Sequence, residues 1–160
     1  MATIKSNKPM VTNFFTFTVP YGNTTTLGYS LKTNATGVVD GGDSDTAPQV
    51  GDVIDLGLLP EGWCLADAQV FVTTGMTATV TGSLGFVYED GVDDTDVPQD
   101  AAYFIKAGAN LATAGRLRAN GSKLVVLPKP ARLILTLAGA ANAKESDIKV
   151  TVSGEMTGAN

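Results

Sequence analysis

The sequence predicts an all-β protein, a single antiparallel β-sandwich of about eight strands arranged like a jelly roll. One short helix and an extended N-terminal arm complete the prediction. The composition has 20 Thr and 18 Gly but only 4 Glu, a balance that favours strands over helices. Apolar and polar residues alternate with a period of two in several segments. Turns, rather than helices of crossover length, separate these segments.

The length of 160 residues fits one domain, and a hydrophobic fraction of 44% is enough to build its core. We expect residues 1–31 to form the N-terminal arm and first strands, and residues 32–160 to form the sandwich body. The start of the chain has no continuous apolar segment after its first lysines, and no run of about 18 apolar residues occurs. We therefore expect a soluble protein made without a cleaved signal, with no membrane partner.

The first predicted strand, Phe14–Val19, is unusually aromatic. It needs cover on both faces, so two interpretations stay open: a strand internal to the domain, or an arm that adds to another subunit. The predicted interface residues are Phe14, Phe15, Phe17, Lys5 and Lys8.

The next predicted strands are Thr24–Leu31, Ile54–Leu58 and Cys64–Val72, with a turn at Pro60–Gly62. The longest alternation follows, from Thr77 to Tyr88. Its even-numbered residues are expected to face the core and its odd-numbered residues to face solvent.

A short helix is predicted at Ala101–Ala107, with Asp100 as its N-cap and Gly108 at its C-terminal end. The segment Ala109–Ala119 has weak periodicity and is predicted to be a loop. The last predicted strands are Lys123–Leu127, Arg132–Ala138 and Ile148–Val152.

The sequence has no His and a single Cys, Cys64, which excludes His-based triads, His metal sites, multi-Cys zinc sites and internal disulfides. Cys64 is predicted to be a small core residue, since no His or adjacent cation activates it. Trp63 is also predicted to be structural, although an exposed Trp beside a Gly turn would suit stacking on a sugar. We expect no enzyme activity and no cofactor.

Two loops concentrate carboxylates. The first contains Asp40, Asp43 and Asp45, and the second contains Glu89, Asp90, Asp93, Asp94 and Asp96. Calcium binding and two-carboxylate glycoside hydrolysis are the chemical alternatives. Neither loop has the spacing of an EF-hand, so we interpret both as solvated hairpin loops.

The net charge of −5 argues against a nucleic-acid partner. Residues 33–105 contain 13 acidic residues and no Lys or Arg, whereas residues 106–160 contain eight basic and three acidic residues. If this separation persists in space, the basic part suits an acidic partner. Alternatively, antiparallel pairing interleaves the two parts.

The run Val50–Gly62, followed by Cys64–Ala68 at the start of a strand, resembles the D-V-I-x-L-G-x-I-P-x-G element of small β-sandwich head proteins of tailed bacteriophages. The segments Ala109–Gly115, Leu133–Ala141 and Ile148–Ser153 are similar to later elements of these proteins in the same order. Trp63 and the loop Glu89–Asp96 do not belong to the pattern.

This resemblance implies a cement or decoration protein that sits on the outer capsid between major capsid subunits, as a dimer or trimer, after synthesis in the host cytoplasm. It implies the major capsid protein as partner and no catalytic residues. Three alternatives remain: a carbohydrate- or receptor-binding module, an enzyme that uses the acidic loops, and a major shell protein, for which the chain is short.

Overall fold

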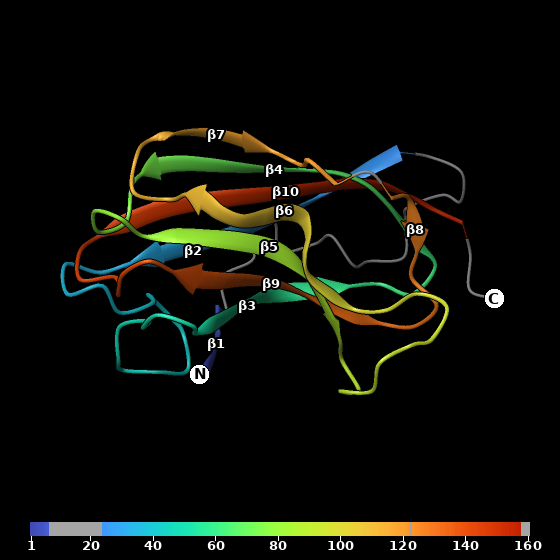
Figure 1. Cartoon of the computed structure of the whole chain (residues 1–160), viewed down its shortest axis with the longest axis horizontal. Helices are drawn as coiled ribbons and strands as arrows, with labels where there is room; N and C mark the ends of the chain where they lie inside the picture. The colour runs from blue at the N-terminus through green and yellow to red at the C-terminus, as the bar shows by residue number, and fades with distance from the viewer. Residues whose placement is uncertain (7–23, 122, 158–160) are drawn as a thin grey trace.

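Ten β-strands and no helix occur in the residues described by this computed structural model, which are 1–6, 24–121 and 123–157 (Figure 1). The strands are β1 Thr3–Lys5, β2 Thr24–Thr33, β3 Val53–Leu59, β4 Trp63–Thr74, β5 Thr81–Tyr88, β6 Asp100–Asn110, β7 Gly115–Arg118, β8 Val125–Val126, β9 Ala131–Ala138 and β10 Ser146–Met156. The strand predicted at Phe14–Val19 lies outside the described residues, as do Lys8, Phe14, Phe15 and Phe17.

The strands form two sheets with the order of a jelly roll. Sheet I has the order β1-β3-β9-β5-β6, and sheet II has the order β2-β10-β4-β7, with β8 pairing to β4. Leaving aside β1 and β8, each sheet has four antiparallel strands, as in the double-sheet jelly roll. The predicted fold class is confirmed. The parallel pairing of β1 with β3 is an addition that the sequence analysis did not predict.

The core lies between the inner faces of the two sheets. In β9, Leu133, Leu135 and Leu137 alternate along the strand and are each at most 2% exposed. Equivalent inward residues on the other strands include Leu31, Ile54, Val70, Leu84, Phe86, Val150 and Val152. Period-two alternation therefore predicts a strand correctly wherever one face of that strand packs against the opposite sheet.

The helix predicted at Ala101–Ala107 is wrong, because this segment belongs to strand β6. Asp100 Oδ1 does accept a hydrogen bond from the Ala102 N–H at 2.8 Å, as in the first turn of a helix. The chain then bulges instead of coiling: Asp100 pairs with Phe86 and Ile105 pairs with Leu84, so several residues lie opposite Gly85.

Aromatic packing holds this bulge in place. The Tyr103 ring makes edge contacts with Phe86 and Phe104, at centroid distances of 5.4 and 4.8 Å. Gly85 makes room for the bulge, because a Cβ there would collide with the Asp100 carbonyl oxygen. The pairing of β6 with β5 thus overrides the local helix signal.

Three further expectations need correction. β5 begins at Thr81 rather than Thr77, since a turn joins Thr77 O to the Val80 N–H and Thr79 has a φ of 70°. The supposedly wet face of β5 is buried at Ser83, which is 8% exposed. The predicted loop Ala109–Ala119 contains β7, which escaped detection because Leu117 is its one residue packed against the core.

Candidate interaction surfaces

Carboxylates of the first acidic loop and of Asp52 anchor strand β1. The Ala2 N–H donates to Asp52 Oδ1 at 2.6 Å, and the Lys5 N–H donates to Asp43 Oδ1 at 2.8 Å. Asp52 also accepts from the Gln49 N–H at 2.9 Å. The hydrogen bond from Ala2, followed by that from Gln49, lowers the pKa of Asp52. Lys5, one of the predicted interface residues, is exposed and fixed through its backbone.

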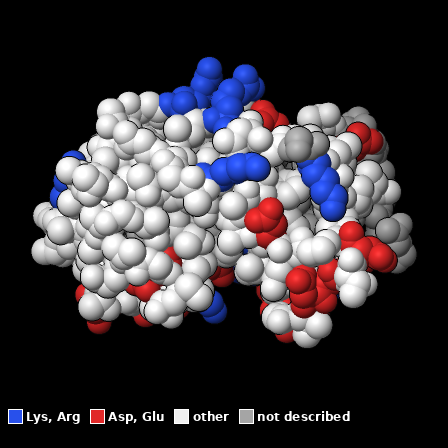
Figure 2. Space-filling view, viewed as in Figure 1, with Lys and Arg blue, Asp and Glu red and all other residues white. Residues whose placement is uncertain are grey.

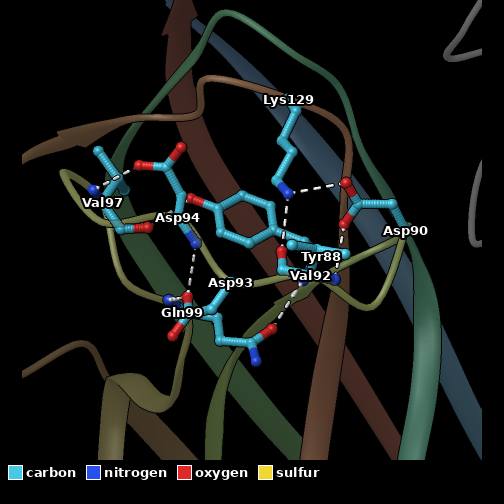
Figure 3. A network of polar contacts seen from close by, with 8 residues as sticks. All are labelled: Tyr88, Asp90, Val92, Asp93, Asp94, Val97, Gln99 and Lys129. Atoms are coloured by element: carbon cyan, nitrogen blue, oxygen red, sulfur yellow. Dashed lines mark hydrogen bonds and ion pairs between the residues drawn. The ribbon is translucent and has the colours of Figure 1, made fainter.

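The second acidic loop, residues 89–99, is organised by its own carboxylates (Figure 3). Asp93 Oδ1 accepts from the Asp94 and Gln99 N–H groups, at 2.8 and 2.7 Å. Asp94 Oδ1 accepts from the Asp96 and Val97 N–H groups, both at 2.9 Å. These oxygens act as turn-forming acceptors.

Lys129 closes this loop against the end of β5. Its Nζ lies 2.7 Å from both Asp90 Oδ2 and the Val92 carbonyl oxygen, and 4.6 Å from the Tyr88 ring centroid. The hydrogen bond from Lys129 lowers the pKa of Asp90. Burial, with smaller effects of Asp94, Asp93 and Asp90, raises the pKa of Tyr88 to about 12, so its hydroxyl stays protonated and donates to the Val97 carbonyl oxygen at 2.6 Å.

In the part of each acidic loop that the structure describes, the side chains are not grouped as a metal site. Within residues 1–6, 24–121 and 123–157, no three His, Cys, Asp or Glu side chains are grouped so as to hold a metal ion. The second loop is a hairpin between β5 and β6, as expected, whereas the expectation of a hairpin is wrong for the first loop, which joins β2 of sheet II to β3 of sheet I. Asp43, Asp93 and Asp94 accept backbone N–H groups, and Asp90 binds Lys129.

A further acidic group, Asp55, is buried in β3. Its carboxylate receives Arg132 Nε at 2.9 and 3.1 Å and Arg132 Nη2 at 2.9 Å, and Arg132 Nη1 lies 3.6 Å from Glu89 Oε1. This group cross-links β3, β9 and the end of β5 on the outer side of sheet I. The alternation in Ile54–Leu58 gave no sign of it, because Asp55 reads there as a solvent-facing residue.

Trp63 is buried, with 1% of its surface exposed, which argues against a role in stacking on a sugar. Its indole packs against Gly154.

Cys64 is half-buried rather than a core residue, because the pairing of β4 with β10 shifts register near Ala66. This shift reverses the direction of the side chains of β4 that precede Ala66. Burial and then Glu155 raise the pKa of the Cys64 thiol, so thiolate chemistry is disfavoured.

The charge separation seen in the sequence persists in part in space. Figure 2 shows basic side chains gathered at the upper edge, over β7, and acidic side chains along the lower edge. On the outer face of sheet II, Phe71 pairs with Lys149 on one side and Arg116 on the other. Among the described residues, neither cation has an ion-pair partner, whereas Arg118 lies 3.4 Å from Asp67.

A pocket of about 190 Å³ opens beside this basic edge. It is lined by Val72, Asn110, Thr113, Ala114, Gly115, Arg116 and Leu117.

Among the described side chains, the large exposed hydrophobic ones are Met1, Val50, Val92 and Leu124. Val92 lies in the second acidic loop. No helix in the described part of the chain is long and apolar enough to cross a membrane.

Comparison with known proteins shows which solved structures share this fold. No protein-family profile and no curated protein matches the sequence. A chain in the capsid of Ralstonia phage GP4 superposes with a TM-score of 0.60 and 18% identity, over 88% of each chain. A chain of the Cyanophage Pam1 capsid asymmetric unit superposes with a TM-score of 0.57 and 16% identity, over 85% of this chain and 86% of the other. The resemblance to phage head proteins is thus confirmed for the fold: this jelly roll is shared with chains of two phage capsids.

Proposed function

We propose that this protein is a virion structural protein that binds the outer surface of an assembled phage capsid and cements adjacent major capsid subunits. The observation that carries the proposal is the shared fold over 88% of this chain and 88% of a chain in a phage capsid. Because the covered fractions are equal, the two chains have similar lengths. A chain of about this size suits an accessory shell component.

The described surfaces support binding rather than catalysis. In the second acidic loop, Asp93 and Asp94 bind backbone N–H groups and Asp90 binds Lys129, and burial raises the pKa of the Cys64 thiol. The two sheets of the sandwich share one core. A protein that binds only to the assembled shell stabilises that shell by mass action. Many copies on a repeated surface multiply this effect.

The N-terminal segment is the proposed attachment to the major capsid protein. The described start of the chain is β1, in which Ile4 is 3% exposed and the backbone is held by Asp43 and Asp52. The segment after Ser6 contains Lys8, Phe14, Phe15 and Phe17. Aromatic side chains and cations are suited to anchoring a chain on a partner surface. Lys5 extends the same contact from the edge of sheet I.

The test uses capsids assembled without this protein, which are mixed with the purified chain and sedimented. Binding is expected to saturate at a fixed number of copies and to raise the temperature at which the capsids break open. Failure of the wild-type chain to co-sediment with intact shells would refute the proposal.

A second variant tests the N-terminal segment separately. Phe14→Ser, Phe15→Ser and Phe17→Ser are combined, and residues 1–6 are kept because Ile4 belongs to the core. We expect loss of capsid binding with unchanged thermal unfolding of the free protein. Retained binding would leave the cement role intact but reject the segment as its attachment. Val50→Ser is a matched control, since Val50 is an exposed apolar residue of the body.

A further inference from the structure

The second acidic loop displays an apolar side chain at a fixed position. The Val92 N–H donates to Asp90 Oδ1 at 2.9 Å, and the Val92 carbonyl oxygen accepts from Lys129 Nζ at 2.7 Å. The backbone of Val92 is therefore held on both sides, yet 61% of the residue is exposed. Because the loop is already ordered by these contacts, little conformational entropy is lost if a partner covers the side chain.

The surroundings of Val92 are strongly negative. Asp93, Asp94 and Asp96 lie within the next four residues, and no described cation lies within ion-pair distance of any of the three. Asp90 and Glu89, in contrast, are paired with Lys129 and Arg132. The loop therefore combines one projecting apolar side chain with unneutralised carboxylates.

The β7 edge has the complementary character. Its pocket of about 190 Å³ has Val72 and Leu117 among its walls, and Arg116, which has no ion-pair partner among the described residues, also lines it. Lys149, likewise without an ion-pair partner in the described part of the chain, adds a second cation on the same face, across Phe71. The pocket is several times larger than the volume of one water molecule in the liquid, about 30 Å³.

One copy cannot bring these two features together. The loop follows Tyr88 at one end of β5, whereas the pocket residue Asn110 pairs with Thr81 at the other end. The eight residues of β5 extend over about 25 Å. Figure 1 shows the β5–β6 connection at the lower right and the β6–β7 connection at the upper left.

We propose that copies of this protein associate head to tail, with Val92 of one copy in the β7 pocket of the next and with the neighbouring carboxylates facing Arg116. Two different surfaces meet in such a contact, so it is heterologous and builds a ring or a chain. The proposal rests on the charges and shape of this chain alone. It can therefore fail without affecting the proposed binding to capsids.

Sedimentation velocity of the purified full-length protein at rising concentration tests the contact. The wild type is expected to form dimers and larger species at about 0.05 M salt and to dissociate at about 1 M salt, where screening is nearly complete. Val92→Ser and Arg116→Glu should each weaken association about tenfold or more. Val50→Ser and Lys5→Glu are matched controls on other parts of the surface and should associate like the wild type.

Mixing the two variants gives the decisive result. Val92→Ser retains an intact pocket, and Arg116→Glu retains an intact loop, so the mixture contains one functional contact per pair. At concentrations where each variant alone sediments as a monomer, we expect the mixture to form a 1:1 dimer that does not grow further. A monomeric wild type, or a mixture that sediments as two separate monomers, would overturn the proposal.

Discussion

At the scale of single residues, the described carboxylates differ mainly in what they bind. Asp43 and Asp52 accept backbone N–H groups of β1, and Asp93 and Asp94 accept those of their own loop. Asp55, itself buried, receives the half-buried Arg132. Acidic residues thus organise β1 and the second acidic loop, whereas Asn34 does so in the turn that it begins. Sequence spacing cannot reveal this, because the donors lie up to 77 residues away.

Replacement of Asp52 by Asn tests this role at the residue scale. One of its two backbone hydrogen bonds is lost and the other no longer involves a charge, so unfolding at pH 7 should require about 1–3 kcal/mol less. The pKa of Asp52 is lowered by folding, so its contribution is present above the unfolded value near 4 and disappears as the pH falls through the folded value.

The difference between wild type and Asp52→Asn should therefore be large at pH 7 and shrink toward pH 3. Urea unfolding at both pH values measures it. A constant difference across this range would show that the negative charge of Asp52 contributes nothing.

At the scale of elements, β6 shows how pairing decides a structure that local preference leaves open. The segment has the Asp, Ala and Gly residues of a short helix, and the Asx contact of Asp100 forms. Its aromatic side chains pack onto the sandwich in a bulged strand instead. The bulge depends on Gly85 in the neighbouring strand β5, because a side chain there would collide with the backbone of the bulge. The sequence of β6 alone does not contain this information.

Gly85→Ala should consequently destabilise the protein although Gly85 lies in a regular strand. The added Cβ meets backbone atoms of Asp100 to Ala102, which cannot move without disturbing the β5–β6 pairing. Overpacking of this kind costs about 1–3 kcal/mol. Gly115→Ala is the control, because no atom lies within 4 Å of a Cβ there. Equal unfolding midpoints for the two variants would contradict this account of the bulge.

At the scale of the whole molecule, the sequence predicted the architecture well and the surface poorly. Seven of the described strands overlap segments predicted from the sequence as strands, and the run Val50–Gly62 pointed to the family of folds. The missed strands β1 and β7 are short and have one inward residue each, so they leave almost no periodic signal. The β7 pocket combines residues of three segments, Val72, Asn110 and 113–117, and only folding brings them together.

Calcium provides a test at this scale. If the acidic loops are held by backbone N–H groups and Lys129 as described, neither calcium nor a chelator should change the midpoint of thermal unfolding. A ligand present at a free concentration of 100 times its dissociation constant would raise the free energy of unfolding by about 2.7 kcal/mol. A clear upward shift with calcium, abolished by Asp93→Asn, would show that a cation occupies the second loop.

The anchoring of Ala2 has a practical consequence. Met1 is 98% exposed, while the next residue is fixed to Asp52 through its backbone N–H. A peptide fused before Met1 would extend from the fold into solvent and would not disturb the pairing of β1 with β3. The start of the chain is therefore a suitable place to attach a purification or labelling tag to the free protein.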